Sequence, residues 1–178
     1  MNTLNLYYSS TGNTEKVAGR IDQALKELGH NHDSINAGEK TEVDLLEYDL
    51  VFVGSGVYAW LPGKPLQDLL IRLRKGYVQN GSIRPGSPKL AGKRAVVYCT
   101  YGGAHTGINE AIPAVKYMGQ LFDHLGFTIL DEIYMVGEYV PENMRDMSQR
   151  GRLGDIRGRP DEHDLVELGE RIRGILRV

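Results

Sequence analysis

Residues 7–14 read Tyr7-Tyr8-Ser9-Ser10-Thr11-Gly12-Asn13-Thr14, and they join a short apolar run to an amphipathic helical pattern. A surface turn uses one or two small polar residues, whereas this stretch has five hydroxyl or amide side chains and a glycine. Glycine lets a backbone approach a ligand closely, and a helix N-terminus flanked by hydroxyl groups favours an anion. The stretch therefore predicts an anion-binding loop. A turn that only caps the helix is the alternative.

Length and composition favour one globular domain. The chain has 178 residues, of which 41% are hydrophobic and 25% charged, as is usual for a folded, water-soluble protein. The formal net charge of −2 gives no electrostatic reason to expect nucleic acid or an anionic membrane as a partner.

The single cysteine, Cys99, excludes an internal disulfide and a four-cysteine metal site within one chain. No stretch approaches the roughly 18 apolar residues of a membrane span, and the first residues lack the pattern of a signal peptide. We therefore expect a cytoplasmic protein with no membrane partner. His30, His32 and Asp33 have a spacing that could hold a metal, but two histidines without a clear third ligand favour a solvated strand edge, and we expect no metal.

Short apolar runs alternate with helical patterns along the chain, which predicts an α/β fold with a parallel sheet and helices on both faces. The expected strands are residues 4–8, 32–36, 50–55, 94–100 and 127–136. Helical stripes begin near Val17, Pro65, Ile108 and Asp161, and Gly29 and Gly126 are the expected C-terminal caps of two of these helices. Residues 43–48 predict one or two short turns, and residues 76–92 and 137–160 predict long loops.

Ligands bind open parallel sheets beyond the carboxyl ends of the strands, so the loops after the strands are the candidate site. The third strand is followed by residues 55–63 and the fourth by residues 100–107, and both segments combine glycines with aromatic side chains. Aromatic faces beside an anion-binding loop suit a flat heteroaromatic ligand that carries a phosphate.

The run LYYSSTGNTEKVAGRI, residues 6–21, resembles the signature with which the flavodoxin family binds the phosphate of FMN. Asn5, where an aliphatic residue is usual, departs from the pattern. The resemblance implies a flavodoxin-like three-layer sandwich with a five-stranded parallel sheet in the order 2-1-3-4-5. It also implies FMN as the cofactor.

Carried onto this sequence, the resemblance implies three groups of cofactor-binding residues. The first loop would hold the phosphate, the third-strand loop would place Tyr58 or Trp60 against the flavin ring, and Tyr101 would cover its other face. His105 would donate a hydrogen bond to the flavin or a substrate, with a solvated loop histidine as the alternative. The predicted residues are Ser9, Ser10, Thr11, Gly12, Asn13, Thr14, Ser55, Gly56, Val57, Tyr58, Trp60, Thr100, Tyr101, Gly102, Gly103 and His105.

Three functions remain open for such a site. The first is an electron carrier that passes electrons from FMN to a partner protein, and the second is an NAD(P)H-dependent reductase of quinones or similar small acceptors. The third is an interaction module that has lost FMN. Family carriers are usually strongly acidic, unlike this chain. The arginine-rich residues 145–159 are expected to face solvent or another subunit, or to fold over the flavin and grip a phosphate. A homo-oligomer is plausible by resemblance to the reductases.

Overall fold

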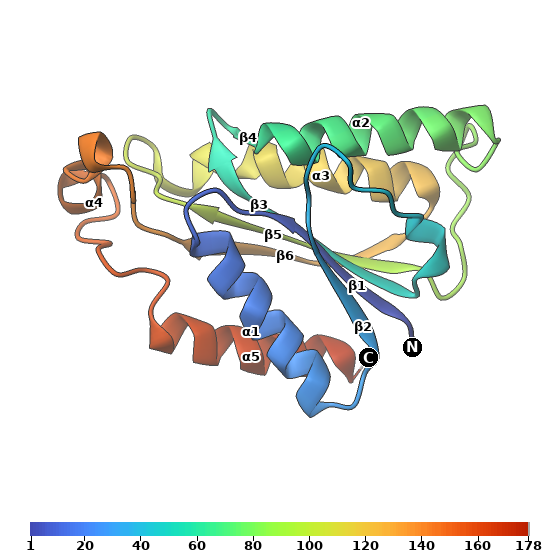
Figure 1. Cartoon of the computed structure of the whole chain (residues 1–178), viewed down its shortest axis with the longest axis horizontal. Coiled ribbons are helices and arrows are strands. Elements are labelled where there is room, and N and C mark those ends of the chain that lie inside the picture. Colours follow the sequence, from blue (N-terminus) through green and yellow to red (C-terminus); the bar gives the residue numbers. More distant parts are fainter. Residues whose placement is uncertain (178) are drawn as a thin grey trace.

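The computed structural model describes residues 1–177 and has three layers, with a parallel sheet between two pairs of helices (Figure 1). The sheet order is β2-β1-β3-β5-β6, which confirms the predicted order of the five parallel strands. A short extra strand, β4, pairs antiparallel with β3. The strands are β1 (Thr3–Tyr8), β2 (His32–Asn36), β3 (Leu50–Tyr58), β4 (Leu61–Pro62), β5 (Arg94–Tyr101) and β6 (Thr128–Val136).

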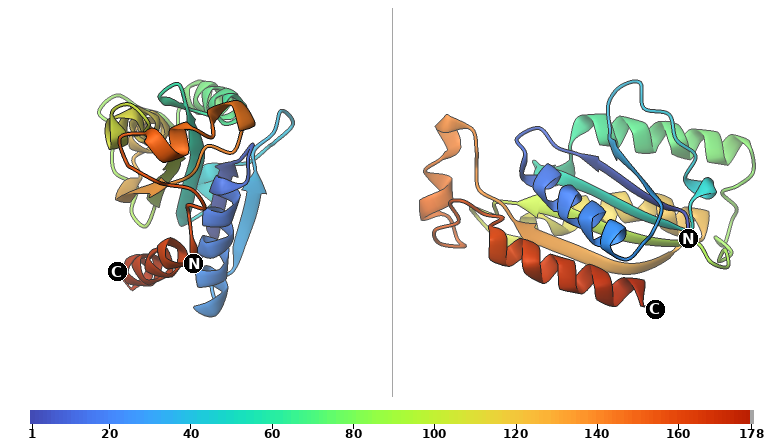
Figure 2. Two further views of the ribbon diagram at one scale, coloured as in Figure 1. Left: turned by 90° about the vertical axis from the view of Figure 1, so that its left-hand side faces the viewer. Right: turned by 60° about the horizontal axis from the view of Figure 1, so that its bottom comes forward.

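The helices lie on both faces of the sheet, as predicted. Helices α2 (Lys64–Gln79) and α3 (Ile112–Leu125) cover one face, and α1 (Asn13–Glu27) and α5 (Glu162–Leu176) cover the other (Figures 1 and 2). Helix α4 (Met147–Arg150) lies beyond the carboxyl ends of the strands. None of the helices among residues 1–177 is long and apolar enough to cross a bilayer. Three short 3₁₀ turns are η1 (Leu45–Glu47), η2 (Gly107–Glu110) and η3 (Glu142–Met144).

The core is split by the sheet because successive side chains of a strand point to opposite faces. Along β3, Val51 and Val53 pack with the residues under α2 and α3, while Leu50 and Phe52 pack with those under α1 and α5. All four side chains are buried. A central strand buried on both sides explains why this segment of the sequence is almost continuously apolar.

Most helix ends follow the predicted signals. Gly29 and Gly126 follow α1 and α3 with φ of 72° and 81°. Asp161 caps α5, where its side chain accepts from the Asp164 backbone and the Asp164 side chain accepts in return. These caps fix where the helices begin and end, and so where the intervening loops reach the edge of the sheet.

Two predicted boundaries are wrong. The segment after Gly76 was expected to be a loop, but α2 continues to Gln79 because Tyr77 is buried, donates to the Asp44 carboxylate and accepts from the Leu45 backbone, each at 2.7 Å. Residues 55–63 were expected to be a loop after the third strand. Instead β3 runs to Tyr58 and turns tightly into β4, so this segment is a β-hairpin.

Candidate functional site

The loop after β1 enters α1 through Gly12, whose φ is 95°. Side chains rarely adopt this conformation, which explains the glycine. The Ser9 hydroxyl accepts hydrogen bonds from the backbone N–H groups of Gly12 and Glu15, both at 3.2 Å. Ser9 therefore caps the N-terminus of α1. The capping alternative accounts for this one residue of the loop.

The rest of this loop keeps its backbone donors unengaged. Within residues 1–177, the N–H groups of Ser10, Thr11, Asn13 and Thr14 have no hydrogen-bond acceptor. They lie at the N-terminus of a 15-residue helix, where the helix dipole also favours a negative charge. The loop thus has the hydrogen-bond donors of an anion-binding site, and it has more of them than a helix cap requires.

A hollow of about 210 Å³ opens beside this loop, at the carboxyl ends of β1, β3, β5 and β6. Tyr58 forms part of one wall, its ring tilted by 57° against that of Tyr8 at 6.1 Å between centroids. From the predicted residues, the hollow is lined by Ser10, Thr11, Asn13, Gly56, Val57, Tyr58, Thr100, Tyr101 and Gly102.

A second hollow of about 400 Å³ adjoins the first and shares with it Val57, Tyr58, Tyr101, Gly102, Tyr139 and Met144. Trp60, Gly103 and His105 line only this second hollow. The first hollow is smaller than the roughly 300 to 1,000 Å³ of ordinary ligand sites, and the second supplies the remaining space. We call the two together the flavin compartment.

The β3–β4 hairpin positions the aromatic wall of this compartment. Its two turn residues, Ala59 and Trp60, have φ of 46° and 69°, although neither is glycine or asparagine. Two-residue hairpin turns of type I′ have positive φ at both positions, and non-glycine residues adopt this conformation only with backbone strain. Trp60 is held at the rim and is 62% exposed, whereas Tyr58 is 39% exposed.

The loop after β5 offers a second set of free donors. In the described chain, the N–H groups of Gly102 and Gly103 have no acceptor, while those of His105 and Thr106 both donate to the Glu110 carboxylate at 2.7 and 2.6 Å. His105 is exposed at the edge of the second hollow. Glu110 therefore fixes the far half of the loop and leaves its glycine half for a ligand.

Three predicted site residues do not reach the compartment with their side chains. Ser9 caps the helix, as described above. The Thr14 hydroxyl lies 2.8 Å from that of Thr100, with both side chains buried. Ser55 is fully buried, and its hydroxyl donates to Gly56 and accepts from the Gly63 N–H, each at 2.8 Å. Ser55 therefore supports the hairpin, which corrects its expected place in the ligand site.

The segment after β6 contributes wall residues that the sequence reasoning did not single out. The Tyr139 ring covers Gly102, and its hydroxyl accepts from the Ala104 N–H at 3.3 Å. Asn13 donates to the Glu138 backbone at 2.8 Å and ties this segment to the first loop. Their position just after a strand is the same signal that identified the other loops. The additional wall residues are Gly137, Glu138, Tyr139, Val140, Pro141 and Met144.

Burial favours the neutral forms of three titratable side chains at or near the site, Tyr101, Tyr139 and Cys99. Desolvation by burial raises the pKa of Tyr101 and of Tyr139 above that of a free phenol. Burial likewise raises the pKa of the Cys99 thiol. Because the thiolate is the reactive form of cysteine, the buried Cys99 is a packing residue near neutral pH.

Comparisons with known proteins agree with this geometry. A family model described as a flavodoxin domain matches residues 4–75, which include the anion-binding loop and the β3–β4 hairpin. No curated protein sequence gives a significant match.

Solved structures with the same fold include the flavodoxin of Streptococcus pneumonia TIGR4, with 19% identity, 99% of each chain covered and a TM-score of 0.68. The oxidised Flavodoxin 1 of Bacillus cereus has 14% identity over 99% of this chain and 98% of its own, with a TM-score of 0.70. The two-electron reduced flavodoxin of Megasphaera elsdenii has 20% identity over 97% and 98%, with a TM-score of 0.59. The protein therefore has the flavodoxin fold along nearly its whole length, and its first 75 residues, which include the anion-binding loop, match the flavodoxin domain model from residue 4 onward.

Proposed function

We propose that this protein binds FMN non-covalently in the flavin compartment and transfers electrons through it. The observation that carries the proposal is the pair of unengaged backbone donor sets, one at each end of an aromatic-walled hollow. FMN has a phosphate at one end and the polar pyrimidine edge of its ring at the other. FMN therefore has a use for both donor sets.

At the phosphate end, the proposed contacts are the backbone N–H groups of Ser10, Thr11, Asn13 and Thr14. A phosphate ester is close to a dianion near neutral pH, and successive N–H groups at a helix N-terminus stabilise it without a lysine. The Thr11 hydroxyl, which has no partner within residues 1–177, adds a further donor. The Thr14 side chain supports the loop from beneath through Thr100.

At the ring end, the proposed contacts are Tyr58 and Tyr101 on the faces and the N–H groups of Gly102 and Gly103 at the pyrimidine edge. Bound FMN would supply the redox chemistry, since no side chain of the compartment exchanges electrons readily at neutral pH. Tyr58 and Tyr101 would orient the ring, and the rim near Trp60, which is 62% exposed, would stay open. An open rim is what electron transfer to a partner requires.

A second candidate is an NAD(P)H-dependent reductase of quinones or similar acceptors. It is favoured by the segment after β6, which closes one side of the compartment and provides further space beside it. A carrier that only meets protein partners has no need of such space. The near-neutral net charge of −2 also differs from the strongly acidic carriers.

The proposal is tested with the visible spectrum of freshly purified protein, followed by titration of the FMN-free protein with FMN. A yellow preparation, or uptake of FMN with quenching of its fluorescence, is expected. A colourless protein that takes up no FMN contradicts the proposal and favours an interaction module. Anaerobic mixing of the holoprotein with NADH and NADPH then separates the two redox functions. Rapid bleaching indicates a reductase, and absence of bleaching with either nucleotide indicates a carrier.

A further inference from the structure

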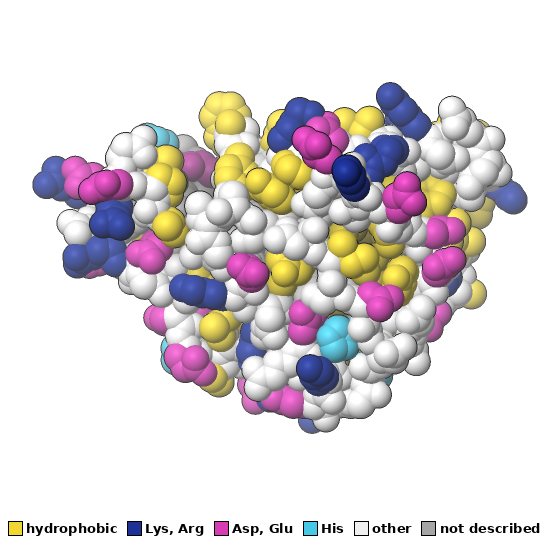
Figure 3. Space-filling view, viewed as in Figure 1, with side chains coloured by type: hydrophobic (Ala, Val, Ile, Leu, Met, Phe, Trp, Pro, Cys, Tyr) yellow, Lys and Arg dark blue, Asp and Glu magenta, His cyan; other side chains and the backbone are white. Residues whose placement is uncertain are grey.

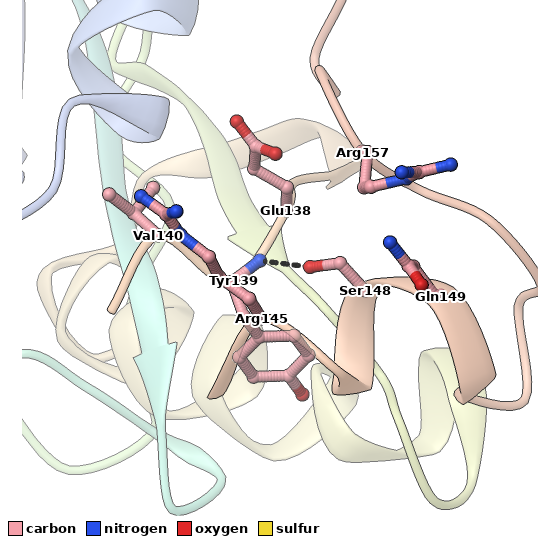
Figure 4. Close-up of a pocket in the computed structure, with 7 residues that line it drawn as sticks. All are labelled: Glu138, Tyr139, Val140, Arg145, Ser148, Gln149 and Arg157. Atoms are coloured by element: carbon pink, nitrogen blue, oxygen red, sulfur yellow. Dashed lines mark hydrogen bonds between the residues drawn. The ribbon is translucent and has the colours of Figure 1, made fainter. Parts of the chain in front are cut away.

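A third hollow, of about 360 Å³, lies on the outer side of the segment after β6 (Figure 4). It is separated from the flavin compartment by one stretch of backbone, because Glu138, Tyr139 and Val140 line both. Nothing in the proposed FMN contacts uses it. Its other lining residues are Arg145, Ser148, Gln149 and Arg157.

The walls of this hollow are fixed by hydrogen bonds around Ser148, although the sequence predicted only a loop here. The Ser148 side chain is 1% exposed, and its hydroxyl accepts from the Tyr139 N–H at 2.8 Å, as the dashed line in Figure 4 shows. The Ser148 carbonyl accepts from the Ile156 N–H, also at 2.8 Å, and Ile156 is buried. The Arg152 N–H donates to Ala104 at 2.8 Å, which fastens the segment to the loop after β5.

Two of the three charged side chains that line this hollow, Glu138 and Arg157, already have partners. The Arg157 guanidinium is paired with the Asp155 carboxylate, and Arg159 is paired with Asp164. The Glu138 carboxylate accepts from the Gly158 N–H at 3.0 Å. Figure 3 shows basic and acidic side chains together at this end of the molecule, so the local field is mixed and individual pairings decide what is available.

Arg145 is the exception within this hollow. In residues 1–177 its guanidinium makes no ion pair and no hydrogen bond, and the same holds for the Gln149 side-chain amide. Figure 4 shows the Arg145 side chain extending toward Val140, the residue shared with the flavin compartment, while Arg157 points away. A guanidinium and an amide without partners at one hollow form a donor set for a carboxylate, sulfonate or phosphate group.

We propose that this hollow binds the anionic group of the small redox partner of the flavin, with Arg145 as the residue that contacts the anion. The inference rests on the proposed function for its redox setting. An organic molecule whose charged group is bound here needs to pass only Tyr139 and Val140 to place its other end in the flavin compartment. The partner is thus an anionic molecule, either a nucleotide donor or an acidic acceptor.

The first test measures binding of inorganic pyrophosphate to the holoprotein by calorimetry. Arg145→Gln should weaken binding about tenfold, the effect of losing one hydrogen bond between charged groups. Arg150→Gln is the matched control, because it makes the same charge change in the same segment but lies outside the hollow. It should change the affinity by less than about twofold. Absence of binding to the wild type, or an equal loss in both variants, overturns the proposal.

The second test distinguishes the sources of the anion through reoxidation of photochemically reduced holoprotein. Each quinone takes two electrons and two protons and leaves as the quinol. Arg145→Gln should raise the apparent KM for a naphthoquinone sulfonate about 5- to 20-fold and leave that for uncharged menadione unchanged. In the reductive half-reaction, in which NADPH reduces the oxidised holoprotein, a selective rise in the KM for NADPH with the sulfonate unaffected identifies a nucleotide phosphate as the anion. Equal effects on the sulfonate and menadione, with NADPH unaffected, overturn the proposal.

Failure of the proposed function is recognised separately. If the protein takes up no FMN, pyrophosphate binding can still be measured on the FMN-free chain, and dependence on Arg145 would keep the anion site without its redox role. If FMN binds and pyrophosphate does not, the flavin proposal stands and the anion site is wrong.

Discussion

The phenol oxygen of Tyr58 lies 2.5 Å from the hydroxyl oxygen of Ser10, and this contact joins the end of β3 to the anion-binding loop after β1. Since Tyr58 also lines both hollows of the flavin compartment, one side chain connects the two proposed ends of the ligand site. The contributions of the Tyr58 ring and of its hydroxyl group to ligand binding can be measured separately by mutation.

We predict that Tyr58→Phe weakens FMN binding by about 1 kcal/mol, the net value of one hydrogen bond. Tyr58→Ala should weaken it by about 2 to 3 kcal/mol, because the ring contact is lost as well. Fluorescence titration of the FMN-free variants measures both. If alanine and phenylalanine have the same effect, the Tyr58 ring does not contact the flavin.

The buried Thr14–Thr100 pair gives a prediction about stability. Thr14→Val removes one hydroxyl and leaves the other unpaired, which should lower the free energy of unfolding by about 1 to 3 kcal/mol even without FMN. The double variant Thr14→Val with Thr100→Val should lose less than the sum of the single changes, since neither group is then left alone. Urea unfolding of the four proteins completes the cycle. Strict additivity would show that the pair does not form.

Gly102 and Tyr139 form a tight contact. A Cβ atom at Gly102 would lie 2.2 Å from the Tyr139 ring, so Gly102→Ala must displace that ring and should destabilise the protein by roughly 1 to 3 kcal/mol. Adding Tyr139→Ala should remove most of this penalty. The matched control is Gly19→Ala in α1, where a Cβ meets nothing within 4 Å and the helix should gain about 0.5 to 1 kcal/mol. Thermal unfolding of the variants measures these changes in stability. If Gly102→Ala leaves the stability unchanged, the close contact between Gly102 and the Tyr139 ring is wrong.

Asn5 departs from the family pattern for a structural reason. Its carbonyl accepts from the fully buried Tyr98 hydroxyl at 2.9 Å, and its amide donates to the Asp22 carboxylate at 2.8 Å. We predict that Asn5→Val destabilises the protein by about 1 to 3 kcal/mol, because the Tyr98 hydroxyl is left unpaired. Tyr98→Phe in the same chain should recover part of the loss. Urea unfolding measures both, and FMN affinity serves as the control that should stay constant.

Asp164 makes the free energy of unfolding depend on pH in the acidic range. Desolvation opposes ionisation of its carboxyl, but hydrogen bonds from Arg159 and the Asp161 backbone outweigh it and lower the pKa below the ordinary value. A lowered pKa in the folded state contributes stability that is present above the unfolded pKa of about 3.9 and is lost as the pH falls through the folded pKa. Unfolding free energies between pH 7 and pH 2 should therefore fall less in Asp164→Asn than in the wild type. Identical slopes would contradict this role.

The sequence pattern was sufficient for the parallel sheet and for most helix ends, because central strands such as β3 are continuously apolar and Gly29, Gly126 and Asp161 are unambiguous caps. The strand order followed from the resemblance to flavodoxins and not from the pattern. It was insufficient where tertiary contacts override local preference. Tyr77 extends α2 past a glycine through a hydrogen bond to Asp44, a residue 33 positions away. The Ala59–Trp60 turn lacks the Asn-Gly pair by which such hairpins are recognised.

The candidate site shows the same limit. Nine predicted residues line the first hollow, since strand ends are readable from pattern. Whether a hydroxyl faces ligand or interior is not readable, because Thr14 and Ser55 turn toward partners that only the fold brings near. Tyr139 was missed because it lies in residues 137–160, which have no periodicity and were expected to be a long loop. The hydrogen bonds around Ser148 show that this segment is ordered and forms a wall of the site.

The hairpin that holds Trp60 also gives the molecule an internal optical reporter. Trp60 is the only tryptophan in the chain, and it lies on a two-residue turn at the mouth of the proposed site. Indole emission therefore comes from this one place, without any label or background from the interior. Ligand arrival, protein docking at the rim and local loosening of the turn can each be followed in real time in the unmodified protein, whatever the eventual identity of the electron donor.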